Sequence, residues 1–412
     1  MRPFYPCGQD RSRPLLFHLC QLGASLALIQ NTFRAHPGAM RVHLPEEECC
    51  TALYAACLAK IPCWEVINFL LLVGDLSLLS ATNVVGYTAS TAVLLNPGVA
   101  VEILQLLYEW DDMIFSRTSS HSFNAIHLAI AHGARTRIIE FIADKVPETL
   151  EIGCGALGYA PLHLALSLQP VRDDLITVLA EKGPSAIAKR TQHDGLSPFC
   201  LACCPQVMVP YEVMDVLVAN YPLPQMDLQG VVDMRPETIK AMFDALNYNC
   251  FVIELNLSKC TLSEHASMAL FHCLAENDTL EIFRFHSSCV TWSDPVLDYI
   301  KRFFAGNSTL RSLVFELGTL HQVRPNMFEG LALNTGLETI DIVTGPSISP
   351  EVGFFVAESI RNCGSINVSP KICLRTNGAQ DAPASNKSWA GPAFFWNCQG
   401  SKRTMRALKE TT

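Results

Sequence analysis

The second half of the chain repeats a spacing of apolar residues that is typical of short strands with one buried face. The spacing has the form L-x-x-L-x-L, and the last two apolar members of each copy alternate with polar neighbours, as side chains do along a strand. We therefore predict five strands, anchored by Leu223/Met226/Leu228, Val252/Leu255/Leu257, Leu280/Phe283/Phe285, Leu310/Leu313/Phe315 and Leu337/Ile340/Ile342.

A helical spacing precedes each of the last four triplets. Apolar residues four positions apart predict one buried helix face each, at Met242/Leu246, Leu270/Leu274, Ile300/Phe304 and Met327/Leu331. An asparagine follows each pair three residues later, at positions 249, 277, 307 and 334. Asparagine tolerates the left-handed backbone conformation that commonly ends a helix, so we expect these asparagines to turn the chain in that conformation.

One strand plus one helix cannot bury its own apolar face, whereas stacked copies share a continuous core, which is the principle of a solenoid. With 27 to 30 residues between successive asparagines, residues 223–366 resemble leucine-rich repeats of the ribonuclease-inhibitor type. That family places an asparagine or cysteine after the strand, which is matched only by Cys260, since Ser288, Gly318 and Gly345 occupy the other equivalent places. We expect the array to end near Ile366, because no strand triplet follows it.

The first half of the chain carries a second repeat. The segments NAIHLAIAHG (124–133) and YAPLHLALSL (159–168) share an apolar-His-Leu-Ala core that recurs after 36 residues. Each copy predicts a helix, a turn, a second helix and a loop. Steps of 36 or 37 residues extend the register to the marker positions His18, Tyr54, Thr91, His127, His163 and Cys200. Expected helix caps are Thr51, Thr88, Asn124 and Ser197, with Pro161 and Pro198 in the first turn and Gly86, Gly158 and Gly195 in the preceding turns.

This pattern resembles the ankyrin repeat and covers residues 13–222. In that family the histidine near the helix start is structural and bonds neighbouring loops. The resemblance therefore implies a structural role for His127 and His163, although histidine could also act as a base or metal ligand.

The predicted fold class is an α plus α/β solenoid, in which an ankyrin-like helical repeat stack (13–222) is followed by a short leucine-rich-repeat arc (223–366). Residues 1–12 form a lead. Residues 367–412 are interpreted as a mostly disordered tail, because their composition shifts to Asn, Ser, Gly and Pro and ends in the basic stretch SKRTMRALKE. Within the tail, the aromatic segment WAGPAFFW (389–396) is expected to dock either on the solenoid or on a partner.

The composition and charge of the chain argue against a nucleic-acid-binding or membrane-spanning protein. The chain has 412 residues, of which 49% are hydrophobic and 17% charged, so it can bury a large core. The net charge of −9 without a dominant basic run predicts neither a nucleic acid nor an anionic membrane as partner. No window reaches the ~18 uninterrupted apolar residues that a membrane span needs.

The 17 cysteines lie mostly inside apolar runs, which favours buried, reduced thiols in an intracellular, cytoplasmic protein. The alternative is a secreted or surface recognition protein. It is supported by the moderately apolar segment 13–30 near the start of the chain and by the glycosylation sequons that begin at Asn277 and Asn307.

Candidate chemistry is sparse. Cys200, Cys203, Cys204 and the nearby His193 could bind a metal or act in redox chemistry, and a cysteine-dependent protein of that kind stays an alternative. These cysteines fall where the repeat predicts packed helix, however, and the sequence has no phosphate-binding glycine loop and no nucleophile motif. We therefore predict no enzymatic activity, no cofactor and no metal.

A binding surface remains as the expected functional feature. We predict a non-enzymatic scaffold or adaptor that binds other proteins, of unknown identity, through the concave face of the strands and the finger loops of the helical repeats. Regulation of a small GTPase is a further alternative that rests on the fold resemblance alone. The candidate contact residues are His121, Tyr159 and His193 at loop tips and Asp227, Asn256, Arg284 and Asp341 between strand anchors.

Overall fold

The structure is a computed structural model, and its chain divides into two compact units. The first unit comprises Met1–Ala186 with Thr191–Asp194, and the second comprises Ile187–Arg190 with Gly195–Thr412. The residues that the structure describes are 14–44, 51–75, 77–83, 85–96, 98–116, 123–155, 157–249, 251–317, 325–344, 371–376 and 394–396. The predicted lead at 1–12 lies outside these residues.

The described part of the first unit is built from helix pairs. In order along the chain these are α1 (Leu15–Gln21) and α2 (Leu26–Ala35), α3 (Ala52–Cys57) and α4 (Trp64–Val73), α6 (Ala89–Leu94) and α7 (Val101–Trp110), α8 (Ala125–Ala131) and α9 (Thr136–Lys145), and α10 (Pro161–Ser167) and α11 (Asp173–Lys182). Short elements join them, namely η1 (Pro37–Arg41), α5 (Ser77–Ser80), η2 (Pro147–Leu150) and η3 (Pro184–Ala188). The first helices of successive pairs contact one another, as do the second helices. Every marker position from His18 to His163 lies on the first helix of its pair.

Local sequence signals set the starts of these helices. The Thr51 hydroxyl accepts a hydrogen bond from the Tyr54 amide at 3.0 Å, and the Asn124 side chain accepts one from the His127 amide at 3.1 Å. Thr88 occupies the cap position of α6 without such a bond. The turn glycines Gly86 and Gly158 have positive φ angles of 82° and 68°, where a side chain would be strained.

The second unit begins with one more helix pair, α12 (Pro198–Cys203) and α13 (Tyr211–Ala219), which the sequence groups with the preceding array. A sheet follows, in which helices alternate with strands. In chain order the elements are β1 (Gln225–Asp227), α14 (Pro236–Leu246), β2 (Glu254–Asn256), α15 (Glu264–Glu276), β3 (Ile282–His286), α16 (Asp294–Gly306), β4 (Ser312–Leu317), η5 (Pro325–Leu333), β5 (Thr339–Thr344), β6 (Lys371–Thr376) and β7 (Phe394–Trp396).

The strands form one open sheet in sequence order from β1 to β7, parallel as far as β6 and antiparallel between β6 and β7. The predicted strand anchors lie in register, since Met226 pairs with Leu255, Leu255 with Phe283, and the row continues to Leu313 and Ile340. These anchors are fully buried. The chain is therefore mostly helical with a parallel sheet, as the apolar spacing predicts.

Three sequence expectations need correction. Leu223, predicted as an anchor, is 48% exposed, because β1 is the first strand of the sheet and no earlier strand covers it. The expectation that no strand follows Ile366 is wrong, since β6 pairs with β5 along its whole length. Within the predicted disordered tail, the backbone of Phe394–Trp396 pairs with β6, so part of the aromatic segment docks on the chain's own sheet.

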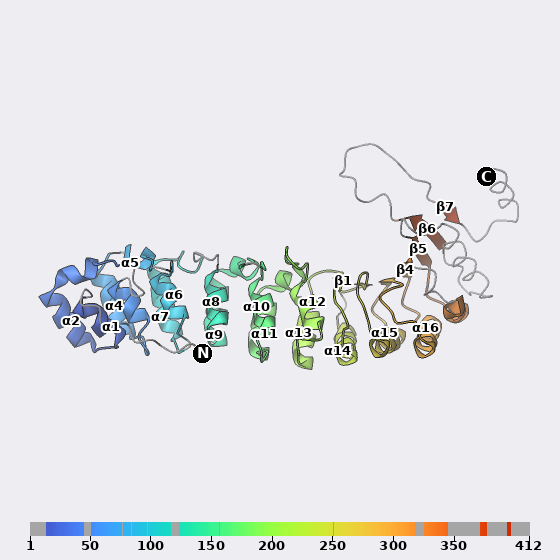
Figure 1. Cartoon of the computed structure of the whole chain (residues 1–412), viewed down its shortest axis with the longest axis horizontal. Helices are drawn as coiled ribbons and strands as arrows, with labels where there is room; N and C mark the ends of the chain where they lie inside the picture. Colours follow the sequence, from blue (N-terminus) through green and yellow to red (C-terminus); the bar gives the residue numbers. More distant parts are fainter. Residues whose placement is uncertain are drawn as a thin grey trace, which may run out of the picture. The chain divides into compact units, whose positions relative to one another are not determined.

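Helices α14, α15 and α16 run along one side of the strands (Figure 1). Aromatic side chains fill the space between the two layers. Phe271 of α15 lies edge-on to Phe283 and Phe285 of β3, with ring centroids 6.5 and 6.2 Å apart, and Phe303 of α16 lies 6.1 Å from Phe283. Burial of these large apolar side chains is the main source of stability for the layer.

A further correction concerns the asparagines. Asn277 and Asn307, which follow α15 and α16, have extended backbone angles (φ −77°, ψ 132° and φ −76°, ψ 122°), so they do not end the helices in the left-handed conformation. Both are buried, together with Asn249 and Asn334. A buried amide must find hydrogen-bond partners. These amides find most of them in the backbone, and Asn277 Nδ2 instead donates to Asn247 Oδ1 and Thr279 Oγ1, each at 3.1 Å.

Each of these asparagines forms hydrogen bonds within its own copy of the repeat and to the copy before it. Asn307 Nδ2 donates to the carbonyls of Leu274 at 2.7 Å and Asn277 at 3.0 Å, while its Oδ1 accepts from the amides of Thr309 at 3.1 Å and Leu310 at 2.8 Å. Asn334 repeats both kinds of bond one copy later, and Asn249 repeats them two copies earlier. We call this series of buried amides the asparagine ladder.

Candidate interaction surface on the exposed face of the sheet

The side of the sheet away from α14, α15 and α16 presents two rows of mainly polar side chains. The strand register places Gln225, Glu254, Ile282, Ser312 and Thr339 in the first row. It places Asp227, Asn256, Arg284, Val314 and Asp341 in the second row. Parallel sheets usually have both faces covered, so a polar face without a covering helix among the described residues is a candidate contact surface. We call it the sheet face.

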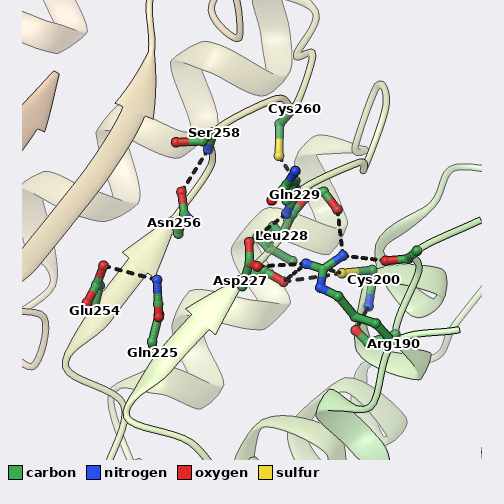
Figure 2. Close-up of polar contacts among 12 residues, drawn as sticks. Arg190, Cys200, Gln225, Asp227, Leu228, Gln229, Glu254, Asn256, Ser258 and Cys260 are labelled. Atoms are coloured by element: carbon green, nitrogen blue, oxygen red, sulfur yellow. Dashed lines mark hydrogen bonds and ion pairs between the residues drawn. The ribbon is translucent and has the colours of Figure 1, made fainter. Parts of the chain in front are cut away.

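Arg284 is the centre of the sheet face. Its Nε lies 3.6 Å from Glu254 Oε1 on β2, and its Nη1 lies 3.7 Å from Glu316 Oε1 on β4. Glu254 also accepts a hydrogen bond from Gln225 Nε2 at 3.2 Å (Figure 2). The Arg284 side chain is 34% exposed, and ion pairs at such sites contribute little stability, so this cluster shapes the charge of the surface more than it holds the sheet together.

Asp227 sits in a cluster where α12 meets β1 (Figure 2). Arg190 Nη2 lies 2.9 Å from Asp227 Oδ2, and the guanidinium also donates to the carbonyls of Asp227 at 3.3 Å, Gln229 at 3.1 Å and Gly195. Cys200 Sγ donates to the Asp227 carbonyl at 3.2 Å. One planar guanidinium thus ties the loop before α12 to the end of β1.

The end of β2 is fixed in a similar way. Asn256 Oδ1 accepts from the Ser258 amide at 3.0 Å, and Cys260 Sγ donates to the Leu228 carbonyl at 2.8 Å (Figure 2). Cys260 occupies the position after the strand at which the resemblance expects a bond to the loop backbone. Asn256, predicted as a contact residue, is only 9% exposed, so its side chain shapes the loop more than it offers a contact.

The predicted loop-tip residues have different environments. His193 is exposed, whereas Tyr159 is partly buried and stacks on His163 with ring centroids 5.3 Å apart. The Tyr159 hydroxyl donates to Asp194 Oδ2 at 3.4 Å. His121 lies outside the described residues. The remaining predicted residue, Asp341, is partly buried and lies in the second row of the sheet face, in register with Val314 of β4.

His127 is placed as a structural residue. Its Nε2 lies 2.8 Å from the Tyr159 carbonyl, and its Nδ1 lies 2.7 Å from Asn124 Oδ1. Burial lowers the pKa of His127 to about 4, so the ring is neutral near pH 7. The ring therefore joins two successive loops of the first unit and is not exposed to a substrate.

The buried cysteines are poor candidates for reactive thiols. Burial raises the pKa of Cys20, Cys154 and Cys289 to about 12 each, and it raises that of Cys203 well above its usual range. A thiol that stays protonated at neutral pH is neither a strong nucleophile nor a ready metal ligand. Within the described ranges, no group of three His, Cys, Asp or Glu side chains could hold a metal ion.

The sequons begin at ladder residues. Asn277 and Asn307 are 4% and 5% exposed, and the Nδ2 atom of Asn307, which a glycan would modify, donates to two buried carbonyls. The folded sheet has no room for a sugar at Asn307. These sequons therefore lend no support to the secreted alternative.

The sequence patterns missed two charged residues that pair with residues of the sheet face. Glu316 lies two positions after Val314, so extending the strand alternation by one step would have found it. Arg190 lies in a loop outside every repeated position, and no spacing in the sequence points to it.

Comparisons with known proteins add no family. No family model matches the chain, and no curated protein matches it in sequence. A solved structure described as leiomodin-1 actin-binding site 2 aligns with 38% of this chain and 90% of that chain, at 16% sequence identity and a TM-score of 0.28. An alignment of that quality carries no conclusion about this chain. Among the described helices, none combines the length and the apolar composition that crossing a bilayer requires.

Proposed function

We propose that this chain is a non-enzymatic protein-interaction scaffold, with an ankyrin-like array at residues 13–222 and leucine-rich repeats from residue 223 onward. The helix pairs that recur with the sequence period and the parallel strands in register support this assignment. Its partners are other proteins in the cytoplasm. The observation that carries the proposal is the sheet face, where the strands align two rows of mainly polar side chains away from the helices.

The chemistry of the sheet face favours binding over catalysis. Arg284 already lies between two carboxylates, and Asp227 is paired with Arg190, so the charged groups form a fixed pattern of complementary pairs. Charge patterns of this kind contribute to the specificity and rate of protein association. Ile282, a partly exposed apolar position in the first row, can add burial to the contact.

Affinity capture from the native cell with matched charge reversals tests the proposal. Arg284→Glu places a third carboxylate beside Glu254 and Glu316 without touching the core, so it should remove proteins that bind the sheet face. The control is Arg302→Glu on α16, an exposed arginine of the helical layer. Proteins retained by the wild type and by Arg302→Glu but lost with Arg284→Glu are the expected result. An unchanged set of captured proteins with Arg284→Glu would exclude the sheet face as the binding surface.

A further inference from the structure

Four apolar side chains form an exposed patch at the edge of the sheet where β1 and β2 begin. Leu223 is 48% exposed, Tyr248 86%, Phe251 55% and Ile253 36%. The amide of Ile253 donates to the Pro224 carbonyl at 2.9 Å, so the segments before the two strands lie side by side. We call these four residues the edge patch. It lies on the edge of the sheet and is separate from the sheet face.

The other copies of the repeat show that the fold does not need apolar residues here. Tyr248 lies one residue before the ladder asparagine Asn249. Phe251 lies two residues after it, and Ile253 lies four residues after it. In the next two copies these positions hold Glu276, Thr279 and Glu281, and then Gly306, Thr309 and Arg311. An exposed apolar cluster that a single copy carries marks a place where something else packs.

Two acidic side chains lie near the Tyr248 end of the edge patch. Asp244 lies on α14, four residues before Tyr248 in the turn that follows this helix, and Asp215 lies on the neighbouring α13. Burial and the carboxylates of Asp244 and Asp215 raise the pKa of Tyr211, whose electrostatic environment also includes Tyr248. The occupant of the edge patch should therefore combine apolar side chains with positive charge.

The chain itself contains a segment with this chemistry. Residues 401–410, SKRTMRALKE, carry the apolar residues Met405 and Leu408 among four basic residues and one acidic residue. Strand β7 runs antiparallel to β6 with Trp396 opposite Ile372, so the chain leaves β7 at the edge where β1 and β2 begin. We call residues 401–410 the basic segment.

The connection is long enough. From β7 to β2 the sheet spans five strand spacings, about 24 Å at ~4.8 Å each. The nine residues from Trp396 to Met405 can extend over about 30 Å. We propose that the basic segment packs on the edge patch of its own chain, with Met405 and Leu408 on the apolar side chains and the basic residues facing the carboxylates near Tyr248. The tether supplies a high local concentration, so a small contact suffices.

Photo-crosslinking of the full chain tests this contact. A diazirine side chain in place of Met405 should crosslink to the peptide that contains residues 248–253. Mixing isotope-labelled with unlabelled protein shows whether both ends of the crosslink belong to one copy. The triple variant Tyr248→Glu, Phe251→Thr and Ile253→Glu carries the residues of the next repeat, so it should fold and yet lose at least ten-fold of the crosslink. The control Met208→Ser, at an apolar residue 67% exposed in the α12–α13 turn, should keep it.

Each other outcome overturns the proposal. A crosslink confined to pairs of labelled and unlabelled copies would show that a second copy occupies the edge patch. A crosslink to another region, no crosslink, or an equal crosslink in the triple variant would show that the basic segment does not dock there. The experiment needs no outside partner, so its failure leaves the proposed scaffold function untouched.

Discussion

Replacing Asn307 by alanine tests the central feature of the second unit, the asparagine ladder. The substitution removes the four side-chain to backbone hydrogen bonds described above and leaves the amides of Thr309 and Leu310 and the carbonyls of Leu274 and Asn277 without these partners. Each lost bond to a buried backbone group costs about 1 kcal/mol or more. We expect Asn307→Ala to lower the free energy of unfolding of the second unit by about 3–5 kcal/mol.

Glycine at the same position separates the two explanations of the asparagine. If Asn307 served mainly to adopt a left-handed backbone conformation, Asn307→Gly would be tolerated better than Asn307→Ala. Because the backbone there is extended and the side chain makes the bonds, we expect Asn307→Gly to be at least as destabilising as Asn307→Ala. A matched control is Asp278→Ala, which changes an exposed side chain in the turn after α15.

Urea unfolding combined with hydrogen exchange measures the effect. Repeat arrays can unfold in parts, so exchange of the amides between α15 and β4 reports the local loss that a single global transition would average. The ladder explanation predicts faster exchange in this region for both Asn307 variants and unchanged exchange for Asp278→Ala. Near-native stability of Asn307→Gly would refute it.

The remaining predictions concern the junction, a buried histidine and the sequons. Arg190→Lys should raise hydrogen exchange at the end of β1 almost as much as Arg190→Ala, because an ammonium cannot reproduce the fork on Asp227 and its neighbours; equal protection in Arg190→Lys and wild type would contradict this. Burial lowers the pKa of His127 from 6.5 to about 4, so stability is fully present above pH 6.5 and is lost as pH falls toward 4. The first unit should lose about 2 kcal/mol between pH 7 and 5 in urea titrations, less in His127→Gln. Folded protein expressed through a secretory pathway should carry no sugar at Asn277 or Asn307 by mass spectrometry; folded protein glycosylated at Asn307 would contradict the ladder.

Spacing alone predicts most of the fold. The L-x-x-L-x-L triplets give the middle anchor of each strand from β1 to β5 in the observed register, because one buried face forces period-two alternation. Strand β6 was missed although Lys371–Thr376 also alternates, with Ile372 and Leu374 between polar or smaller residues. No asparagine stands six residues before Ile372, as one does before the middle anchor of each strand from β2 to β5, so the repeat spacing does not predict this strand.

Spacing identifies the ladder asparagines, but the predicted left-handed backbone role was wrong. The sequence itself contains evidence against that role. A purely conformational role at a helix end favours glycine, yet glycine stands at none of the four ladder positions. Recurrence of an amide where glycine would serve indicates that the side chain makes bonds. The partners are mainly backbone groups of the same copy and of the preceding copy, which no residue pattern can name.

The candidate site could be predicted only in outline. Strand alternation gives the two rows of the sheet face, because register and alternation determine which side chains share a face. Strand alternation does not show that Asp227 forms an ion pair with Arg190, which lies in a loop outside the repeat. Nor does it show that the Asn256 side chain accepts a hydrogen bond from the loop that follows β2. Whether a polar residue is free for a partner depends on tertiary neighbours, which lie 37 positions apart for Arg190 and Asp227.

In both kinds of repeat, a recurring polar side chain bonds a backbone carbonyl of a neighbouring copy. His127 faces a carbonyl 32 residues later, and Asn307 bonds a carbonyl 30 residues earlier. Cys200, at a helix-pair marker position, bonds the carbonyl at the end of β1. These polar residues, which recur with the period, therefore satisfy the backbone of neighbouring copies, and this explains why His127 and Cys200, which suggested chemistry, are buried in structural bonds. Under the proposed scaffold function, specificity is expected in residues that break the period, such as Arg284 on the sheet face and Tyr248 and Phe251 on the edge patch. Substituting those residues by their counterparts from the next copy should change what the chain binds and leave the stack folded.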